Sequence, residues 1–382
     1  MRKGVVILGA TGSIGRSARA ALAALPERFH VVGLVARNNL AELAAQAAEF
    51  RPEWTVTTDP ARAGELAELL PPDLKAAGGM EKVHELVTAP QTDIVLCAIV
   101  GTAGLEPVIA ALRAGKRVAL ASKEVLVLAG EIIERELAAN PSAELIPVDS
   151  EHSAIFQCLA GRKHREIRNL YLTASGGAFR TWPRERLAAA TVEDALAHPT
   201  WNMGAKVTID SASMMNKALE MVEARHLFRV EPEQVRVLIH PQSVIHSMVE
   251  LNDSSLIAQL SRPDMRFAIT YAFTYPERAA TNLPALDFST RLGLELQLPE
   301  PGRYPALVFA EEAMKRGGTL PGVMNAANEV AVDKFRRGEI RFPAIWRIIE
   351  KTMSTHEVEP QSDFQTIRVA DAWARAYAAG LR

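Results

Sequence analysis

Two carboxylates, Asp149 and Glu151, lie two residues apart at the end of the apolar run Leu145–Val148. Side chains at positions i and i+2 of a strand point to the same side, so both carboxylates can reach one cation. Ligands that are all oxygen suit Mg²⁺ or Mn²⁺ better than zinc. Helix capping is the alternative, because Asp149 or Ser150 can cap a helix that begins near Ser153 while Glu151 favours its positive N-terminus. This stretch alone leaves both interpretations open.

A third acid, Glu220, shares a segment of helical pattern with Asn216 and Lys217. Their i, i+1 and i+4 spacing predicts one helical face, and Ser211 precedes this helix or lies in its first turn. Such a face can hold a phosphate group through Asn216 and Lys217 and offer Glu220 to a metal. The alternative is a solvated polar face with an ordinary Lys–Glu pair, which is more common on helices.

Two loops carry side chains that can bind an anion or cover a ligand. Ser175 lies in Thr173-Ala-Ser-Gly-Gly177 after an expected strand, where hydroxyl and backbone N–H groups suit an anion; a plain turn is the alternative. The second loop, His198–Lys206, contains Trp201 and Met203 and is interrupted by Pro and Gly. Composition alone slightly favours a Trp201 that is pinned to a core over one in a closing lid.

The N-terminal apolar run Val5–Leu8 leads into the turn Gly9-Ala-Thr-Gly12-Ser-Ile-Gly15 and then into a helical pattern. Glycines let the backbone approach a pyrophosphate, and the start of a helix supplies free N–H groups. The spacing differs from G-x-G-x-x-G, and a tight turn without ligand is the alternative, but the strand–turn–helix context favours nucleotide binding. The turn residues expected to contact the cofactor are Thr11, Gly12, Ser13 and Ile14.

The expected second strand, Val31–Val35, ends in Arg37, Asn38 and Asn39. An acid at this position would hold the ribose 2′-hydroxyl of NAD, whereas a basic residue accommodates the 2′-phosphate of NADP. Since no acid is present, NADPH is the expected cofactor, and an exposed loop arginine is the alternative.

Strand and helix patterns alternate along the first 149 residues, as in a doubly wound parallel sheet. Lys123 and Glu124 follow the expected strand Arg117–Ala121, at the sheet edge where ligands bind. Lys123 there either touches a substrate or cofactor oxygen or pairs with Glu124. The later segments suggest an α+β domain and then a C-terminal helical bundle. The expected division is 1–149 for NADPH binding, 150–274 for catalysis and metal binding with a lid loop, 275–300 as a linker and 301–382 as the helical domain.

Bulk composition excludes several classes of partner. The net charge is −2, so no general attraction to nucleic acid or to an anionic membrane is expected. Two cysteines form no disulfide framework and fit a reducing cytoplasm, and no apolar run is long enough to span a membrane. In Val237–Val249, His240 and His246 are expected to be structural, while the spacing of Asn325, Asn328 and Glu329 predicts an exposed polar face.

Taken in order, motifs along essentially the whole chain resemble the 1-deoxy-D-xylulose 5-phosphate reductoisomerase family. The motifs are Gly9-Ala-Thr-Gly12-Ser-Ile-Gly15, Pro147-Val-Asp-Ser-Glu-His152, Ser175-Gly-Gly177, His198-Pro-Thr-Trp-Asn-Met-Gly204, Asp210-Ser-Ala-Ser-Met-Met-Asn-Lys-Ala-Leu-Glu220, Ile239-His-Pro-Gln-Ser-Val-Ile-His-Ser-Met-Val249, Leu286-Asp-Phe288 and Asn325-Ala-Ala-Asn-Glu329. Departures are Ser122 where the family has Asn, Arg37-Asn38-Asn39 where it has Gly-Lys-Asn, and Ala178 where Pro is common.

The resemblance implies a Rossmann-like first domain and an isomerisation followed by NADPH-dependent reduction, giving 2-C-methyl-D-erythritol 4-phosphate for isoprenoid synthesis. It implies a metal held by Asp149, Glu151 and Glu220. It also implies that a phosphorylated sugar is bound by Lys123, Ser150, Glu151, Ser175, His198, Trp201, Met203, Ser211, Asn216, Lys217 and Glu220, with Lys123 and His198 also catalytic. The resemblance further implies cofactor contacts from Ser122, Glu124 and Gly204. It also implies that Trp201 is part of a lid and that the protein is a homodimer. The rival interpretations are a simple NADP-dependent semialdehyde-type dehydrogenase and a non-catalytic NADP-binding regulator.

Overall fold

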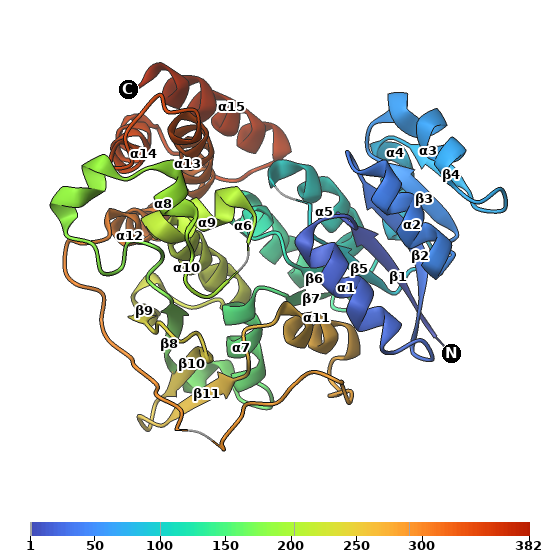
Figure 1. Cartoon of the computed structure of the whole chain (residues 1–382), viewed down its shortest axis with the longest axis horizontal. Coiled ribbons are helices and arrows are strands. Elements are labelled where there is room, and N and C mark those ends of the chain that lie inside the picture. The colour runs from blue at the N-terminus through green and yellow to red at the C-terminus, as the bar shows by residue number, and fades with distance from the viewer. Residues whose placement is uncertain (1, 100, 202, 290) are drawn as a thin grey trace. The chain divides into compact units, whose positions relative to one another are not determined.

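The computed structural model describes residues 2–99, 101–201, 203–289 and 291–382, and it forms two compact units (Figure 1). Unit 1 comprises Met1–Val125, Ile133–Ser153 and Asp264–Pro284. Unit 2 comprises Leu126–Ile132, Ala154–Pro263 and Ala285–Arg382. Among the described residues, no helix combines the length and the apolar character that crossing a membrane requires.

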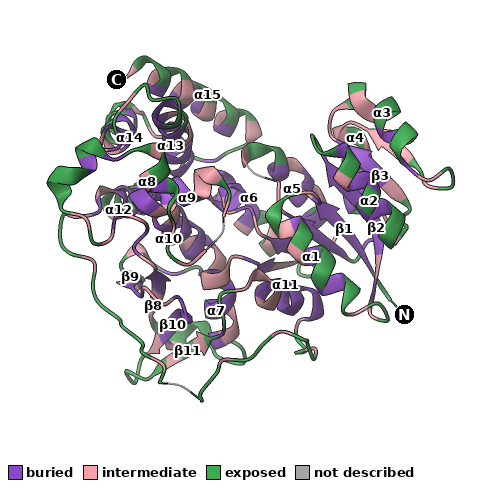
Figure 2. Cartoon of the chain, in the orientation of Figure 1, coloured by how far each residue is buried: buried purple, intermediate pink, exposed green. Residues whose placement is uncertain are grey.

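Unit 1 is built on a seven-stranded sheet with the order β4-β3-β2-β1-β5-β6-β7, and its neighbouring strands are parallel. The strands are β1 (Lys3–Leu8), β2 (Phe29–Ala36), β3 (Trp54–Thr57), β4 (Ala76–Gly78), β5 (Ile94–Cys97), β6 (Arg117–Leu120) and β7 (Glu144–Pro147). The central strands are buried along most of their length (Figure 2), as expected for apolar runs covered on both faces. The predicted doubly wound sheet is therefore confirmed.

A helix connects each strand of this sheet to the next, as parallel pairing requires. These helices are α1 (Ser13–Ala23), α2 (Leu40–Phe50), α3 (Ala63–Leu69), α4 (Met80–Thr88), α5 (Leu105–Arg113) and α6 (Glu124–Ala139); α7 (Ser150–Cys158) follows β7, and α11 (Met265–Thr274) comes later in the chain. The sequence patterns predicted neither the short edge strand β4 nor α4 and α6. The order of strands changes direction between β1 and β5, so the loops after these two strands flank the position where ligands bind in such sheets.

Unit 2 contains a mixed four-stranded sheet with the order β11-β10-β8-β9. Its strands are β8 (Ile167–Ala174), β9 (Val235–Ile239), β10 (Ile245–Leu251) and β11 (Leu256–Leu260). β8 pairs with β9 in parallel and with β10 in antiparallel orientation, and β11 forms an exposed edge. Three helices, α8 (Val192–Leu196), α9 (Ala205–Ser213) and α10 (Met215–Phe228), follow β8 in the chain before it returns to β9.

The C-terminal helices share a hydrophobic core with α10 and the second sheet. They are α12 (Pro305–Arg316), α13 (Leu320–Arg336), α14 (Ala344–Thr355) and α15 (Phe364–Gly380). The helical C-terminal region expected from the sequence is confirmed. Aromatic rings join it to the rest of unit 2: Phe342 packs edge-on against Phe179 with ring centroids 4.7 Å apart.

The compact units group residues differently from the four segments expected along the sequence. Helix α11 belongs to unit 1, where it packs against α1, although the sequence division placed it with the catalytic segment. An ion pair of 2.7 Å between Arg28 and Glu277 lies beside this contact. The pairing joins residues more than two hundred positions apart, so no local pattern can indicate it.

Candidate metal, substrate and cofactor site

The predicted site residues of unit 1 gather at the carboxyl edge of its parallel sheet. The glycine turn follows β1, the Arg37 loop follows β2, Lys123 follows β6 and Asp149 follows β7. Parallel strands all present their carboxyl ends at the same edge, and loops there carry ligand contacts in doubly wound sheets. One structural rule thus brings together residues that the sequence spreads over more than a hundred positions.

In the glycine turn after β1, two glycines are required by the packing of the backbone, because a side chain at either position would clash with it. Gly9 has φ +89° and an added Cβ would lie 2.5 Å from the carbonyl oxygen of Ala98. A Cβ on Gly15 would overlap the carbonyl oxygen of Ala10. Gly12 differs, because it is exposed at the start of α1 and a Cβ there would meet only the Gly9 oxygen at 3.3 Å. Gly12 therefore leaves open space in front of the free N–H groups of α1, as a phosphate-binding turn needs.

The loop after β2 is exposed at Arg37, Asn38 and Asn39. The side chain of Asn39 caps α2, because its Oδ1 accepts a hydrogen bond of 3.2 Å from the backbone N–H of Glu42. Arg62 donates from Nη1 to the carbonyl oxygens of Arg37 and Asn38 at 3.4 Å and 3.0 Å. The turn is thus held through its backbone and through Asn39.

Lys123 forms an ion pair of 2.7 Å with Asp149, and both side chains are almost completely buried. Asp149 also caps α7, since its Oδ1 accepts a hydrogen bond of 3.2 Å from the N–H of Glu151 and lies 3.1 Å from Nδ1 of His152. Ser150 is not the cap, because its hydroxyl donates to the carboxylate of Glu151. Asp149 therefore caps α7 and forms an ion pair with Lys123 at the same time.

Ser122 and Glu124 flank Lys123 and are both buried. The Ser122 hydroxyl lies 2.6 Å from the carbonyl oxygen of Ile99, in the loop after β5, and 3.2 Å from Oε2 of Glu124. Ser122 thus links the loops after β5 and β6 within unit 1. This contact adds a positioning role for a residue that stays a predicted cofactor contact.

In unit 2, Asn216 and Lys217 converge on Glu220 as their helical spacing predicted. Asn216 donates from Nδ2 to Oε1 of Glu220 at 2.5 Å, and the ammonium group of Lys217 pairs with Oε2. Lys217 is 3% and Glu220 1% exposed, so the solvated-face alternative is wrong. Opposite charges compensate each other in this buried cluster.

Ser211 precedes the helix of Glu220, as predicted, and lies near the end of the separate helix α9. Met214 adopts φ +63° between α9 and α10, and this left-handed residue separates the two helices. Gly177 packs directly against the backbone of Ser211, where an added Cβ would overlap the Ser211 carbonyl oxygen. This close approach brings the Ser175 loop and α9 together.

Ser175 and His198 form the second polar pair of unit 2, with the Ser175 Oγ 3.0 Å from His198 Nε2. His198 Nδ1 accepts hydrogen bonds from the backbone N–H groups of Thr200 at 3.1 Å and Trp201 at 2.9 Å. Because Nδ1 is an acceptor, the neutral ring carries its proton on Nε2 and donates to Ser175. Burial lowers the pKa of His198, which favours this neutral form.

The loop after His198 is partly exposed at Trp201 and Met203, and Asn202 lies outside the described residues. The Trp201 ring is 6.3 Å from the ring of His246, and the Thr200 hydroxyl donates to the Pro241 carbonyl oxygen at 3.4 Å. Gly204, at the start of α9, has open space around it. Among the described residues of this loop, Thr200 and Trp201 therefore contact the segment from Pro241 to His246.

The sequence missed a buried polar chain that supports α9. Asp210 is 1% exposed, pairs with Lys206 at 2.8 Å and accepts a hydrogen bond of 2.9 Å from Asn328 of α13. Asn325 and Asn328 are completely buried, so the exposed polar face predicted for them is wrong. Their helix packs inside unit 2, where Asn328 donates to the buried Asp210 and Asn325 donates to the half-buried Glu329 at 3.0 Å.

The histidines of the second sheet are structural, as predicted for His240. Its Nδ1 lies 2.7 Å from the carbonyl oxygen of Glu295, and its Nε2 accepts hydrogen bonds from the N–H groups of Val244 and Ile245 at 3.1 Å and 3.0 Å. The bond to Glu295 holds the extended segment that contains this residue against the end of β9. His240 has no acceptor or donor left for a ligand.

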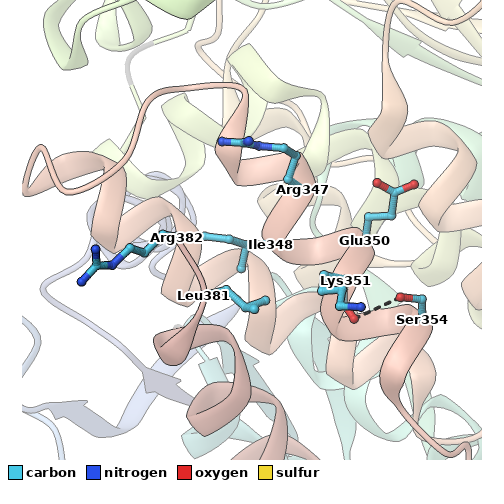
Figure 3. Close-up of a pocket in the computed structure, with 7 residues that line it drawn as sticks. All are labelled: Arg347, Ile348, Glu350, Lys351, Ser354, Leu381 and Arg382. Carbon is cyan, nitrogen blue, oxygen red and sulfur yellow. Dashed lines mark hydrogen bonds between the residues drawn. The ribbon is translucent and has the colours of Figure 1, made fainter.

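A separate hollow of about 450 Å³ lies on α14 and the last residues of the chain (Figure 3). Its lining residues are Arg347, Ile348, Glu350, Lys351, Ser354, Leu381 and Arg382. None of the predicted site residues lines this hollow, and it contains no carboxylate–ammonium cluster like that of Glu220. The hollow is therefore distinct from the candidate site.

Comparison with protein families finds three matching models in chain order. Residues 5–130 match the model described as 1-deoxy-D-xylulose 5-phosphate reductoisomerase, residues 145–228 match its C-terminal domain, and residues 260–377 match the DXP reductoisomerase C-terminal domain. A 1-deoxy-D-xylulose 5-phosphate reductoisomerase of Trichlorobacter lovleyi is 48% identical over 98% of this chain and 96% of its own length. The enzyme of that name from Moorella thermoacetica is 46% identical over 100% and 98%.

Solved structures give the same result. A 1-deoxy-D-xylulose 5-phosphate reductoisomerase from Zymomonas mobilis in complex with NADPH is 41% identical, covers 99% of this chain and 98% of its own, and has a TM-score of 0.94. A DOX-P reductoisomerase in complex with NADPH, fosmidomycin and magnesium is 36% identical, covers 98% and 97%, and has a TM-score of 0.92. Sequence and structure agree over nearly the whole chain, so it belongs to the 1-deoxy-D-xylulose 5-phosphate reductoisomerase family.

Proposed function

We propose that this protein converts 1-deoxy-D-xylulose 5-phosphate to 2-C-methyl-D-erythritol 4-phosphate in an NADPH- and divalent-metal-dependent isomerisation and reduction. The observation that carries this proposal is the buried Asn216–Lys217–Glu220 cluster on a chain whose other unit is a dinucleotide-type sheet. A simple dehydrogenase needs the sheet but not this cluster. Identity of 48% to a named reductoisomerase over nearly the full length supports the same substrate.

Asp149, Glu151 and Glu220 are proposed to hold one Mg²⁺ or Mn²⁺ ion. Their chemistry fits, because all three offer carboxylate oxygens and Glu220 is buried with a positively charged partner. When bound, such an ion polarises carbonyl and hydroxyl oxygens of the substrate as a Lewis acid. Lys123, which pairs with Asp149, and Ser150 would donate hydrogen bonds to oxygens of the same substrate.

Ser175, Ser211, Asn216, Lys217 and His198 are proposed to bind the substrate phosphate. Ser175 accepts from His198 Nε2 and from the N–H of Gly177 at 3.2 Å, so its own hydroxyl proton is directed elsewhere and can serve an anion. A grip on the phosphate far from the reacting carbons orients the substrate and helps a lid close over it. Trp201 and Met203, on the loop before α9, would cover the pocket and exclude water.

NADPH is proposed to bind along the carboxyl edge of the unit 1 sheet. Thr11, Gly12, Ser13 and Ile14 would hold the pyrophosphate at the start of α1, and the Arg37 loop would meet the 2′-phosphate. Ser122, Glu124 and Gly204 complete the predicted contacts. Two of the solved relatives are complexes with NADPH, which supports the choice of cofactor.

The decisive experiment follows NADPH absorbance with 1-deoxy-D-xylulose 5-phosphate and Mg²⁺. We expect turnover that EDTA abolishes and Mn²⁺ restores; metal-independent turnover would favour a simple dehydrogenase, and cofactor binding without NADPH consumption a regulator. Glu220→Gln is expected to lose most turnover, by about 100-fold or more, while NADPH binding persists. Glu250→Gln is the matched control, because Glu250 also accepts from an asparagine amide (Asn169, 2.6 Å) but lies outside the site. Near-normal turnover of Glu220→Gln would refute the metal assignment.

A homodimer through the exposed β11 edge is proposed as the assembly. Leu256 and Leu260 are 55% and 38% exposed on this strand, and Phe288 and Leu298 are each 76% exposed in the extended segment after unit 1. A second copy would cover this apolar edge and pair its free backbone groups. We expect a dimeric mass in sedimentation analysis and a monomer for Leu256→Lys; a monomeric wild type would refute the assembly. We also propose that the protein lies in the cytoplasm, which a content of only two cysteines, both buried, supports.

A further inference from the structure

Arg303 binds three backbone carbonyl oxygens of one short turn. Its Nη2 lies 2.9 Å from the oxygen of Phe179, 2.9 Å from that of Arg180 and 2.7 Å from that of Trp182. The side chain is only 13% exposed, and the carboxylate of Glu300, 3.4 Å away, is largely solvated. The guanidinium therefore finds its main partners in this turn.

The clamped turn directly follows the loop of Ser175. Two consecutive left-handed glycines, Gly176 at φ +85° and Gly177 at φ +68°, reverse the chain just before the turn. The Phe179 ring packs at 4.7 Å against that of Trp182, and the turn is thereby fixed on its other side by aromatic contacts. Only residues 175–178 separate the end of β8 at Ala174 from the clamped turn, so a shift of the turn is passed to the Ser175 loop.

Arg303 lies in a turn that leads into a helix. It lies two residues before α12, and its neighbour Tyr304 is buried. All three contacts come from Nη2, at the far end of the guanidinium, and the shorter lysine side chain does not bring its ammonium group to the same point. Carbonyl oxygens that lose such a donor inside the protein cost free energy, and the turn would move to regain partners. Moving the turn also moves Gly177, which touches the backbone of Ser211.

We propose that Arg303 is a positioning residue for phosphate binding, acting through the 179–182 turn to hold Ser175 and Ser211 at the spacing that the sugar phosphate requires. Arg303 does not touch the substrate in this proposal. It fixes the backbone on which Ser175 and Gly177 lie, and thereby the direction of the Ser175 hydroxyl and the approach of α9. This inference rests on the proposed function and deepens its phosphate grip.

The test compares Arg303→Lys and Arg303→Gln with wild type in the full-length enzyme. We expect the KM for 1-deoxy-D-xylulose 5-phosphate, and the inhibition constant of inorganic phosphate as a competitor, each to rise about tenfold or more. NADPH binding, followed by fluorescence, is expected to stay within about twofold, because the altered loop belongs to unit 2 and the cofactor turn to unit 1.

Arg162→Lys is the matched control. Arg162 also donates to backbone carbonyl oxygens in unit 2, those of Cys158 at 2.6 Å and Ala160 at 3.3 Å, but it caps the end of α7. We expect its KM and phosphate inhibition to match wild type. Folded Arg303 variants with unchanged KM and phosphate inhibition would overturn the proposal, as would an equal effect of Arg162→Lys. A wild type that consumes no NADPH with the sugar phosphate would instead refute the proposed function.

Discussion

His198 donates a hydrogen bond from Nε2 to the Oγ of Ser175, 3.0 Å away, and its other ring nitrogen fixes that direction. Nδ1 accepts from the N–H groups of Thr200 and Trp201, so the same ring orders the first residues of the proposed lid. One neutral imidazole thus connects the phosphate loop to the lid loop. Protonation of Nδ1 would break both backbone bonds at once, because an N–H donor cannot accept.

Acid is therefore expected to weaken substrate binding through His198. Burial lowers the pKa of His198 below the ordinary value of 6.5. At a pH between the lowered pKa of the folded protein and the ordinary pKa of the unfolded chain, the unfolded chain binds more protons than the folded protein. His198 therefore makes the free energy of unfolding rise with pH across this interval and fall as the pH drops through it. We expect KM for the sugar phosphate to rise as pH falls below 6.5, measured by NADPH oxidation over about pH 5 to 8.

The substrate phosphate also titrates in this range, so a comparison with His198→Asn isolates the residue. The variant cannot titrate at this position and is expected to show a weaker pH dependence of KM, with a higher KM at neutral pH. If KM depends on pH in the same way in both proteins, His198 does not cause the rise in KM at low pH. The inhibition constant of inorganic phosphate, measured over the same pH range, shows how binding of the phosphate group alone changes with pH.

Gly177→Ala is expected to damage substrate binding and stability together. Gly177 has φ +68°, where an L-residue costs about 1–2 kcal/mol. The added Cβ also overlaps the carbonyl oxygen of Ser211, so α9 must shift away from the Ser175 loop. We expect a lower urea midpoint and a KM for the sugar phosphate raised about tenfold or more. Gly161→Ala is the control, since Gly161 has φ +76° but open space around it, and it should lose stability without a change in KM.

In the glycine turn after β1, Gly15 is expected to be needed for folding and Gly12 for binding of the cofactor. Gly15→Ala places a Cβ against the Ala10 carbonyl oxygen and is expected to lower the unfolding midpoint. Gly12→Val meets little protein and should leave the midpoint nearly unchanged while weakening NADPH binding, because a side chain then fills the space before the N-terminus of α1. Fluorescence titration with NADPH and urea unfolding of both variants measure the two effects. Equal NADPH affinity for Gly12→Val and wild type would show that the cofactor does not approach this turn.

Sequence patterns predicted the parts of the fold that depend on local chemistry. The apolar runs before Gly9 and Asp149 are strands, and the spacing of Asn216 and Glu220 places them in contact. Long-range packing could not be read this way. The burial of Asn328 depends on Asp210, a residue 118 positions away, and the Arg303 clamp depends on carbonyl oxygens that carry no sequence signal. The left-handed Met214 that separates two helices also has no marker, since methionine rarely adopts this conformation.

The thiols are expected to be inert. Burial raises the pKa of Cys97 to about 12, so almost none of it is thiolate near neutral pH, and Cys158 is 4% exposed. Native protein should react with neither iodoacetamide nor a disulfide reagent and should keep full activity after treatment. Both thiols should become reactive in urea. Rapid modification of the folded protein would show that one of the two units opens locally.

Arg37 is expected to select NADPH over NADH. Arg37 is exposed after β2, and Arg62 holds the carbonyl oxygen of this residue, so the Arg37 side chain remains available to an anion. A charged hydrogen bond to the 2′-phosphate contributes about 1.5–3 kcal/mol, so Arg37→Gln should raise the NADPH dissociation constant by about 10- to 100-fold. Binding of NADH, which lacks that phosphate, should hardly change. Arg19→Gln removes an equally exposed arginine of unit 1, paired with Glu49 on the helix surface, and should alter neither. An equal loss of NADPH and NADH binding in Arg37→Gln would mean that the residue shapes the loop without reading the phosphate.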